Sequence, residues 1–123
     1  MRYLMLLTNP TEQVERWQQL TPDEAKAERD QEIPKWGAFM QWAAEQGLQL
    51  DGLELDSPHT AKTIRGENGG AVVTDGPFPE TKEIIGGYFV GEFDDLDQAI
   101  DAASRIPIAE SGSVEIRPLV DEN

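Results

Sequence analysis

Two segments of the chain are apolar on both faces of an extended strand, and this is the strongest feature of its hydrophobic pattern. In residues 2–7 and again in residues 88–93, large apolar side chains occupy both alternating sets of positions. Successive side chains of a strand point to opposite faces of a sheet, so both faces of these two strands need cover. A further strand is predicted for residues 114–120, with Val114, Ile116 and Val120 on one face.

A long helix is predicted after Thr21. Thr21 can cap the helix, Pro22 suits its first turn, and Glu24 completes a capping box. Gly47 is typical of the position just past a helix C-terminus. The apolar positions between these signals recur at helical spacing, and they are Ile33, Trp36, Gly37, Met40, Ala43 and Ala44. Because Pro34 removes a backbone donor inside this pattern, we expect two helical pieces.

The rest of the chain divides into shorter elements. A short helix is predicted within residues 9–20, an extended segment at 48–55, and a hairpin of 60–65 with 71–74 across the glycine-rich turn 66–70. Residues 75–87 are predicted to be irregular. A second helix opens at Asp94 and Asp95 and stops before Pro107. Its predicted buried stripe consists of Leu96, Ala99, Ile100 and Ala103.

This order of elements predicts one α+β domain over residues 1–123, with a ferredoxin-like βαββαβ plan and an inserted β-hairpin. Two helices can cover only one face of an antiparallel sheet, yet the strands at 2–7 and 88–93 are apolar on both. A second copy of the chain is the simplest cover for the other face. We therefore expect a homodimer that pairs through the open faces of its sheets.

Composition narrows the possible partners. The net charge of −14 and a pI near 4.2 disfavour binding to nucleic acid and to anionic membranes. No apolar run approaches the roughly 20 residues of a membrane span, and the first residues do not resemble a signal peptide, so a cytoplasmic location is expected. With no cysteine and His59 as the one histidine, neither a metal site nor a cofactor is expected.

One unusual string suggests a family. Asp75-Gly76-Pro77-Phe78 is followed by Glu80-Thr81-Lys82-Glu83, and then by Gly86-Gly87-Tyr88-Phe89. This motif resembles the signature of the DGPF branch of the YCII-related proteins, and the likeness extends over nearly the whole chain. The resemblance implies a dimeric α+β barrel with a cleft near the motif. It also implies a regulatory setting, because relatives of this branch are associated with extracytoplasmic-function sigma factors.

The wider YCII family is associated with a His and Asp pair whose histidine lies on the first helix. This chain has no histidine between Thr21 and Gly47, so the pair is incomplete. Asp75 is then the candidate catalytic residue, since a carboxylate at the end of a buried strand can have a raised pKa and act as a general acid or base. Asp75 is equally suited to a side-chain-to-backbone hydrogen bond within its turn.

A ligand-binding cleft is predicted between the helix layer and the sheet. Its candidate residues are Tyr3, Arg65, Asp75, Phe78, Lys82 and Tyr88. The cations can hold an anionic ligand, whereas Arg65 and Arg117 can instead neutralise neighbouring carboxylates, and Lys82 can lie in a solvated loop. His59 suits either an acid–base role or an exposed loop. Packing is expected for Trp36, Met40 and Trp42. The first two belong to the core stripe, whereas Trp42 lies off it and can instead touch a partner or a ligand.

Three functions remain open from the sequence. The first is a dimeric protein that binds a small molecule as a sensor or accessory protein. The second is a cofactor-free enzyme in which Asp75 moves a proton on a small organic substrate, by analogy with other dimeric α+β barrels. The third is a protein-binding module in which the DGPF motif is only a structural corner.

Overall fold

The computed structural model of the chain describes residues 1–76 and 83–120. Its body is a four-stranded antiparallel sheet in the order β2-β5-β1-β6. The strands are β1 (Arg2–Pro10), β2 (Leu50–Glu54), β5 (Glu83–Glu92) and β6 (Ser113–Pro118). This strand order is that of a ferredoxin-like sheet, with β3 and β4 inserted between its second and third strands. The predicted α+β plan is therefore confirmed.

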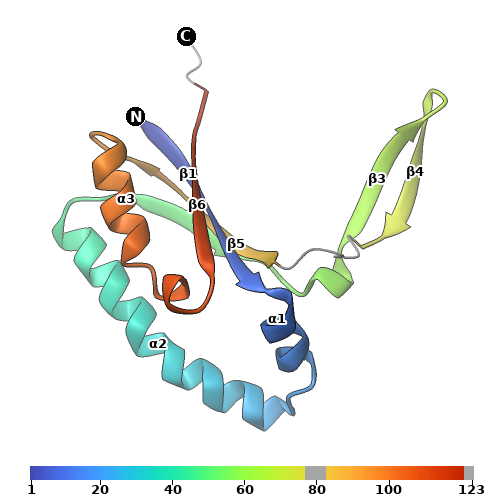
Figure 1. Ribbon diagram of the computed structural model, residues 1–123, viewed down its shortest axis with the longest axis horizontal. Helices are drawn as coiled ribbons and strands as arrows, with labels where there is room; N and C mark the ends of the chain where they lie inside the picture. The colour runs from blue at the N-terminus through green and yellow to red at the C-terminus, as the bar shows by residue number, and fades with distance from the viewer. Residues whose placement is uncertain (77–82, 121–123) are drawn as a thin grey trace.

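The helices are α1 (Thr11–Gln18), α2 (Pro22–Glu45) and α3 (Leu96–Ser104), with short 3-10 turns η1 (Pro58–Thr60) and η2 (Pro107–Glu110). Figure 1 shows α2 and α3 on the same side of the sheet. The core lies between them and β1, where Tyr3, Met5 and Leu7 are buried against Phe39 of α2 and the alanines of α3. Leu4 and Leu6 alternate with these residues and point to the other face, where they are half-buried. The prediction that β1 is apolar on both faces is confirmed.

The inserted hairpin consists of β3 (Lys62–Glu67) and β4 (Gly70–Asp75). Its two-residue turn places Asn68 and Gly69 at positive φ, as such a tight turn requires. The two strands form a separate sheet, which stands away from the body in Figure 1. The predicted hairpin is confirmed, with a shorter turn than expected.

The prediction that Pro34 divides the first long helix is wrong. Helix α2 runs without a break through Pro34. It begins with the predicted capping box, in which the Glu24 N–H donates to Thr21 Oγ1 (3.2 Å) and the Thr21 N–H donates to Glu24 Oε1 (3.1 Å). The proline lies on an exposed stretch, where water can hydrogen-bond the carbonyl group that loses its partner.

The predicted buried stripes are wrong in part, because helical spacing alone does not show which of two adjacent positions faces the sheet. On α2 the buried residues are Phe39 and Ala43, while Ile33 and Met40 are exposed. On α3 the buried residues are Ala99, Ala102 and Ala103, whereas Leu96 and Ile100 are exposed. Small alanine side chains let α3 approach the sheet closely, so the larger side chains are left at its margin.

Two strand boundaries also differ from the prediction. Residues 83–87 belong to β5, although residues 75–87 were expected to be irregular. The pairing of β5 with β1 continues past Gly86 and Gly87 with a shift of register between Leu7 and Thr8. Such a bulge lets a glycine-rich segment stay in the sheet. At the other end, β6 stops at Pro118, so Val120 lies beyond the strand and is exposed.

Candidate functional site

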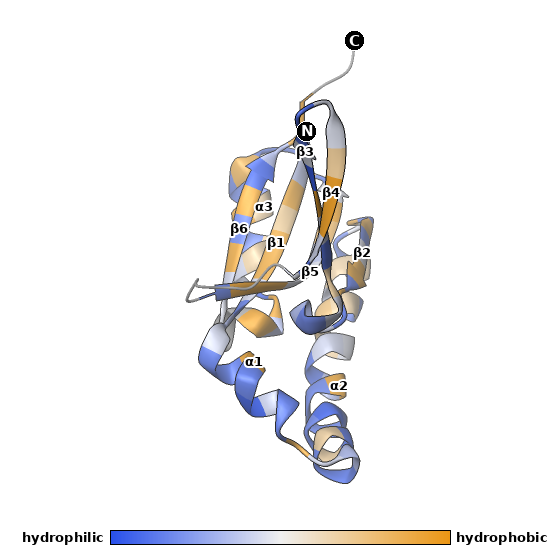
Figure 2. Cartoon of the chain, turned by 90° about the vertical axis from the view of Figure 1, so that its right-hand side faces the viewer, coloured by the Kyte–Doolittle hydropathy of each residue, from blue (hydrophilic) through white to orange (hydrophobic). Residues whose placement is uncertain are grey.

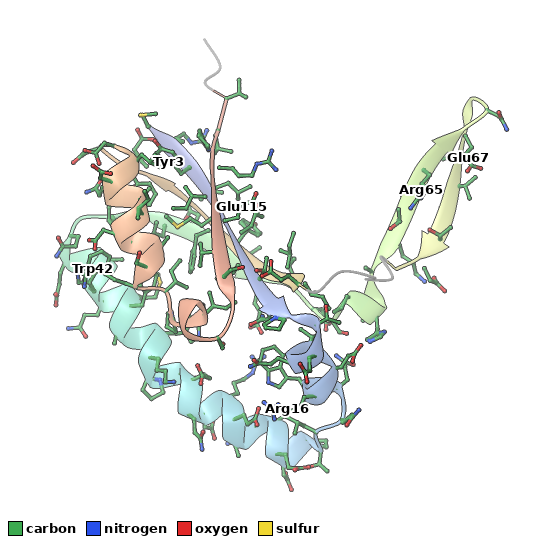
Figure 3. All side chains as sticks on the ribbon, viewed as in Figure 1. Tyr3, Arg16, Trp42, Arg65, Glu67 and Glu115 are labelled. Atoms are coloured by element: carbon green, nitrogen blue, oxygen red, sulfur yellow. The ribbon has the colours of Figure 1, made fainter. Side chains whose placement is uncertain are left out.

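The predicted cleft residues do not lie together in one chain. Tyr3 is buried on the helix-covered face of the sheet, where its hydroxyl lies 3.7 Å from Met1 Sδ (Figure 3). Tyr88 is paired with Leu6 and shares the opposite face with it. The sheet therefore separates the two tyrosines. Phe78 and Lys82 lie outside the described residues, as does the rest of the motif from Pro77 to Lys82.

Asp75 and Arg65 both lie on the hairpin, but on opposite sides of it. Asp75 pairs in register with Lys62, and the two side chains form an ion pair, whereas Arg65 is paired with Val72. The Asp75 side chain is 72% exposed. The expectation that it ends a buried strand is wrong, because every described position of β4 is exposed. The described part of a single chain therefore gives Asp75 no enclosed substrate site.

The other charged candidates are exposed as well. His59 lies on η1, where its backbone N–H donates to Ser57 Oγ (3.2 Å). Arg117 lies on β6 with its Nε 3.7 Å from a carboxylate oxygen of Glu115. This geometry matches the alternative in which Arg117 neutralises a neighbouring carboxylate rather than holding a ligand.

A hollow of about 380 Å³ lies between α2 and the end of α3, on the outer side of the helix layer. Its volume lies within the usual range of a small-molecule site. Phe39 and Ile106, which are both buried, contribute apolar surface to it. The full set of lining residues is Lys35, Ala38, Phe39, Trp42, Ser104, Arg105, Ile106 and Pro107.

Trp42 and Arg105 give this hollow its chemistry. The Arg105 guanidinium lies 4.3 Å from the centre of the Trp42 ring, and Trp42 stacks on Phe39 with ring centroids 6.2 Å apart. The Nε–H of Arg105 donates to Asp101 (3.3 Å), and a guanidinium has four further N–H donors. Lys35, which lies 3.5 Å from Glu32, adds a second cation to the lining.

This arrangement suits a small organic anion with a flat apolar part. The aromatic and aliphatic lining can pack against the apolar part, while Arg105 and Lys35 can attract a carboxylate. The sequence singled out Trp42 as lying off the core stripe, which was a useful signal. It gave none for Arg105, because the contact joins two helices that are distant in the chain.

The open face of the sheet carries a second candidate surface. Leu4, Leu6, Tyr88 and Val90 lie side by side on β1 and β5 and are half-buried. Leu53 on the edge strand β2 is paired with Tyr88 and is 68% exposed. We call these five residues the open-face patch. Its apolar character agrees with the predicted pattern, and it can serve as an interaction surface.

Two classes of site find no support in the part of the chain that the structure describes. Within residues 1–76 and 83–120, no group of three or more His, Cys, Asp or Glu side chains is placed to hold a metal ion. Among the described helices, none is both long and apolar enough to cross a membrane.

Comparison with known proteins places the chain in a family. It is 43% identical over 61 residues to an uncharacterized protein of Rhizobium meliloti (strain 1021), a match that covers 48% of this chain and 49% of that protein. The chain thus matches about half the length of this curated relative. The family model of the YCII-related domain matches residues 1–123. The resemblance suggested by the motif is thereby confirmed at the level of the family, and the chain belongs to the YCII-related family.

Proposed function

We propose that this protein is a homodimer that binds a small organic anion, as a sensor or accessory protein of the DGPF branch. The observation that carries the proposal is the hollow beside Trp42, where Arg105 and Lys35 join an apolar lining. Each of these cations is paired with a carboxylate of its own helix, Arg105 with Asp101 and Lys35 with Glu32, so the hollow is close to neutral within a chain of net charge −14. A ligand carboxylate can be held there by the further N–H donors of the guanidinium.

The open-face patch supports the dimeric part of the proposal. A two-fold axis places the patch of one subunit against the same patch of the other, so that both are covered at once. The alternative acid–base enzyme gains no such support, because Asp75 is exposed and paired with Lys62. A cytoplasmic location remains a prediction of the sequence.

Titration with benzoate tests the binding site, and benzyl alcohol serves as its uncharged counterpart. Benzoate should shift the backbone amide signals of residues 38–42 and 104–106 in NMR spectra, and benzyl alcohol should bind more weakly. Arg105→Gln should weaken benzoate binding about tenfold, since a hydrogen bond to a charged group contributes roughly 1.5 kcal/mol or more.

The matched control is Arg117→Gln, which removes an exposed arginine from the opposite face of the sheet. This variant should bind benzoate like the parent protein. Equal losses in the two variants would show that only the general charge of the protein matters. If benzoate shifts only the amide signals of the open-face patch, the binding site is not the hollow beside Trp42.

Sedimentation equilibrium tests the dimer. The parent protein should sediment as a dimer, and Leu6→Asp should sediment as a folded monomer, because an unpaired carboxylate is costly to bury in an apolar interface. A parent protein that stays monomeric up to high concentration would refute the dimeric part of the proposal. Circular dichroism checks that the variant keeps its secondary structure.

A further inference from the structure

Among the described residues, the hairpin of β3 and β4, which we call the arm, makes no extensive contact with the body of the chain. All its described positions are exposed except Thr63, which is half-buried. At its root the two strands of the arm are held to each other, because the Gly76 N–H donates to the Ala61 carbonyl and Thr63 Oγ1 donates to the Gly76 carbonyl. A two-stranded hairpin that packs against nothing else is only marginally stable in water. The arm therefore needs a surface to cover it.

One side of the arm is apolar. Ile64 and Val73 face each other across the two strands and are 69% and 62% exposed, and Ala71 lies further along the same side. The Lys62–Asp75 ion pair also belongs to this side, at the root. Figure 2 shows a hydrophobic stretch on β4. An exposed apolar pair on a projecting hairpin is typical of a contact surface.

Charge favours another copy of this chain as the partner. Within residues 62–75, Lys62 and Arg65 balance Glu67 and Asp75, so the arm is neutral (Figure 3). The whole net charge of −14 therefore lies outside the arm. Two copies repel each other over most of their acidic surfaces, and the neutral arm can approach an acidic body with little repulsion. No described element of the chain covers the apolar side of the arm or the open-face patch, and each copy has both.

The area needed for a stable dimer points the same way. Stable interfaces bury about 800 Å² on each partner. Most of the open-face patch is already half-buried, so that it offers limited area by itself. Leu53 and Ile85 are the most exposed apolar residues of this face, and they lie opposite Tyr88 and Thr8 respectively. If each subunit of a two-fold dimer places its arm on the other, the interface gains the surface around Ile64 and Val73 from both subunits.

We propose that the arm of each subunit packs its Ile64–Val73 side against the open-face patch of the second copy, at Leu53 and Tyr88. This inference rests on the proposed dimer. Asp75 lies on the same side of the arm as Ile64, so that it is carried to the face that holds Tyr88 in the second copy. Asp75 and Tyr88, two of the predicted site residues, lie apart within one chain. In this dimer they meet only across the interface. Arg65 lies on the opposite side of the arm and points away from this contact.

A pair of adjacent valines provides the matched test. Val73 lies on the apolar side of the arm and Val72 on the other, so Val73→Asp and Val72→Asp make the same chemical change on opposite sides. Val73→Asp should raise the dimer dissociation constant about tenfold or more in sedimentation equilibrium, because it places a charge in an apolar contact. Val72→Asp should change it far less. Leu53→Asp, on the body, should act like Val73→Asp.

Cross-linking then identifies the surface that the arm touches. The chain has no cysteine, so introduced cysteines are the sole thiols. Val73→Cys mixed with Leu53→Cys should give a disulfide-linked heterodimer under mild oxidation, since a disulfide needs Cα atoms within about 7 Å. Val72→Cys mixed with Leu53→Cys should give much less. Protection of amides 62–75 from hydrogen exchange should also rise with protein concentration.

Several results would overturn the inference. If Val73→Asp and Val72→Asp weaken the dimer equally or not at all, while Leu6→Asp still dissociates it, the arm is not part of the interface and the proposed dimer stands. If the arm amides are protected to the same extent at every concentration, the arm folds back on its own body. A parent protein that is monomeric throughout would refute the dimer and the arm contact together.

Discussion

The main sheet and the arm are built from similar residues but have opposite surroundings. In β1, Tyr3, Met5 and Leu7 are buried under helices, whereas Ile64 of the arm is exposed although its sequence context is also that of a good strand. β-branched residues and a tight Asn68-Gly69 turn favour the hairpin locally. Burial depends instead on which elements lie over a strand. The stability of this fold should therefore be concentrated in the body.

The comparison between the body and the arm is tested most directly by making the same substitution in both regions. Ile84 of β5 is buried and Ile64 of β3 is exposed, and both are isoleucines on strands. Ile84→Ala should lower the free energy of unfolding by about 3 kcal/mol, because it removes buried apolar surface and leaves a cavity. Ile64→Ala should change it by less than about 0.5 kcal/mol. Urea denaturation at low protein concentration measures both values.

A low protein concentration matters because pairing between copies would otherwise stabilise the arm. If Ile64→Ala proves as costly as Ile84→Ala under these conditions, the arm is packed within its own chain. The contrast between the two regions would then be false. A small effect of both substitutions would instead show that the buried end of β5 contributes little to stability.

Two strand glycines repeat the comparison with a smaller effect. A Cβ atom on Gly52 of β2 would lie 2.2 Å from the Tyr88 carbonyl oxygen and 2.5 Å from the Phe89 ring, which are impossible contacts. The nearest atom to a Cβ on Gly66 of β3 would be 3.9 Å away. Gly52→Ala should therefore cost about 2 kcal/mol in the free energy of unfolding through overpacking, while Gly66→Ala should be nearly neutral. Thermal unfolding of both variants checks this, and equal melting temperatures would contradict it.

The sequence predicted local features better than long-range ones. The capping box at Thr21 and the turn at Asn68 depend on neighbouring residues, and both could be predicted. The path of α2 through Pro34 depends on solvent exposure along the helix, which the pattern alone does not give. The choice of Phe39 over Met40 for the core follows from how α2 meets the sheet, so helical spacing could not distinguish adjacent positions.

The candidate site was harder to predict for the same reason. The alternation along β1 and along β5 assigns Tyr3 and Tyr88 each to one face of its own strand. Only the register between the two strands shows that they lie on opposite faces of the sheet. Arg105 meets Trp42 because α3 ends beside α2, and no local motif encodes that meeting. Asp75 belongs to an exposed strand because the hairpin leaves the body, although its residue types are typical of a covered strand.

The corner between α1 and α2 sharpens the comparison in another way, because it is exposed like the arm but is held by polar contacts. Arg16 of α1 forms a forked contact with Glu28 of α2, with distances of 2.8 Å and 3.1 Å. The hydrogen bonds from Arg16 hold the pKa of Glu28 below its ordinary value. A lowered pKa in the folded state means that the contact stabilises the fold above the pKa of the unfolded chain. This contribution is lost as the pH falls through the folded value.

Replacing Arg16 by Gln should therefore raise the pKa of Glu28 toward its ordinary value, and a carboxyl NMR titration measures the change. Glu24 provides an internal control in the same spectra, because its pKa is lowered mainly by the hydrogen bond from the Thr21 backbone and should stay low in the variant. The pair is exposed, so the effect on the free energy of unfolding should be small. An unchanged Glu28 titration would mean that the fork is not formed in solution. The corner would then resemble the arm, as an exposed segment with no contact of its own to hold it.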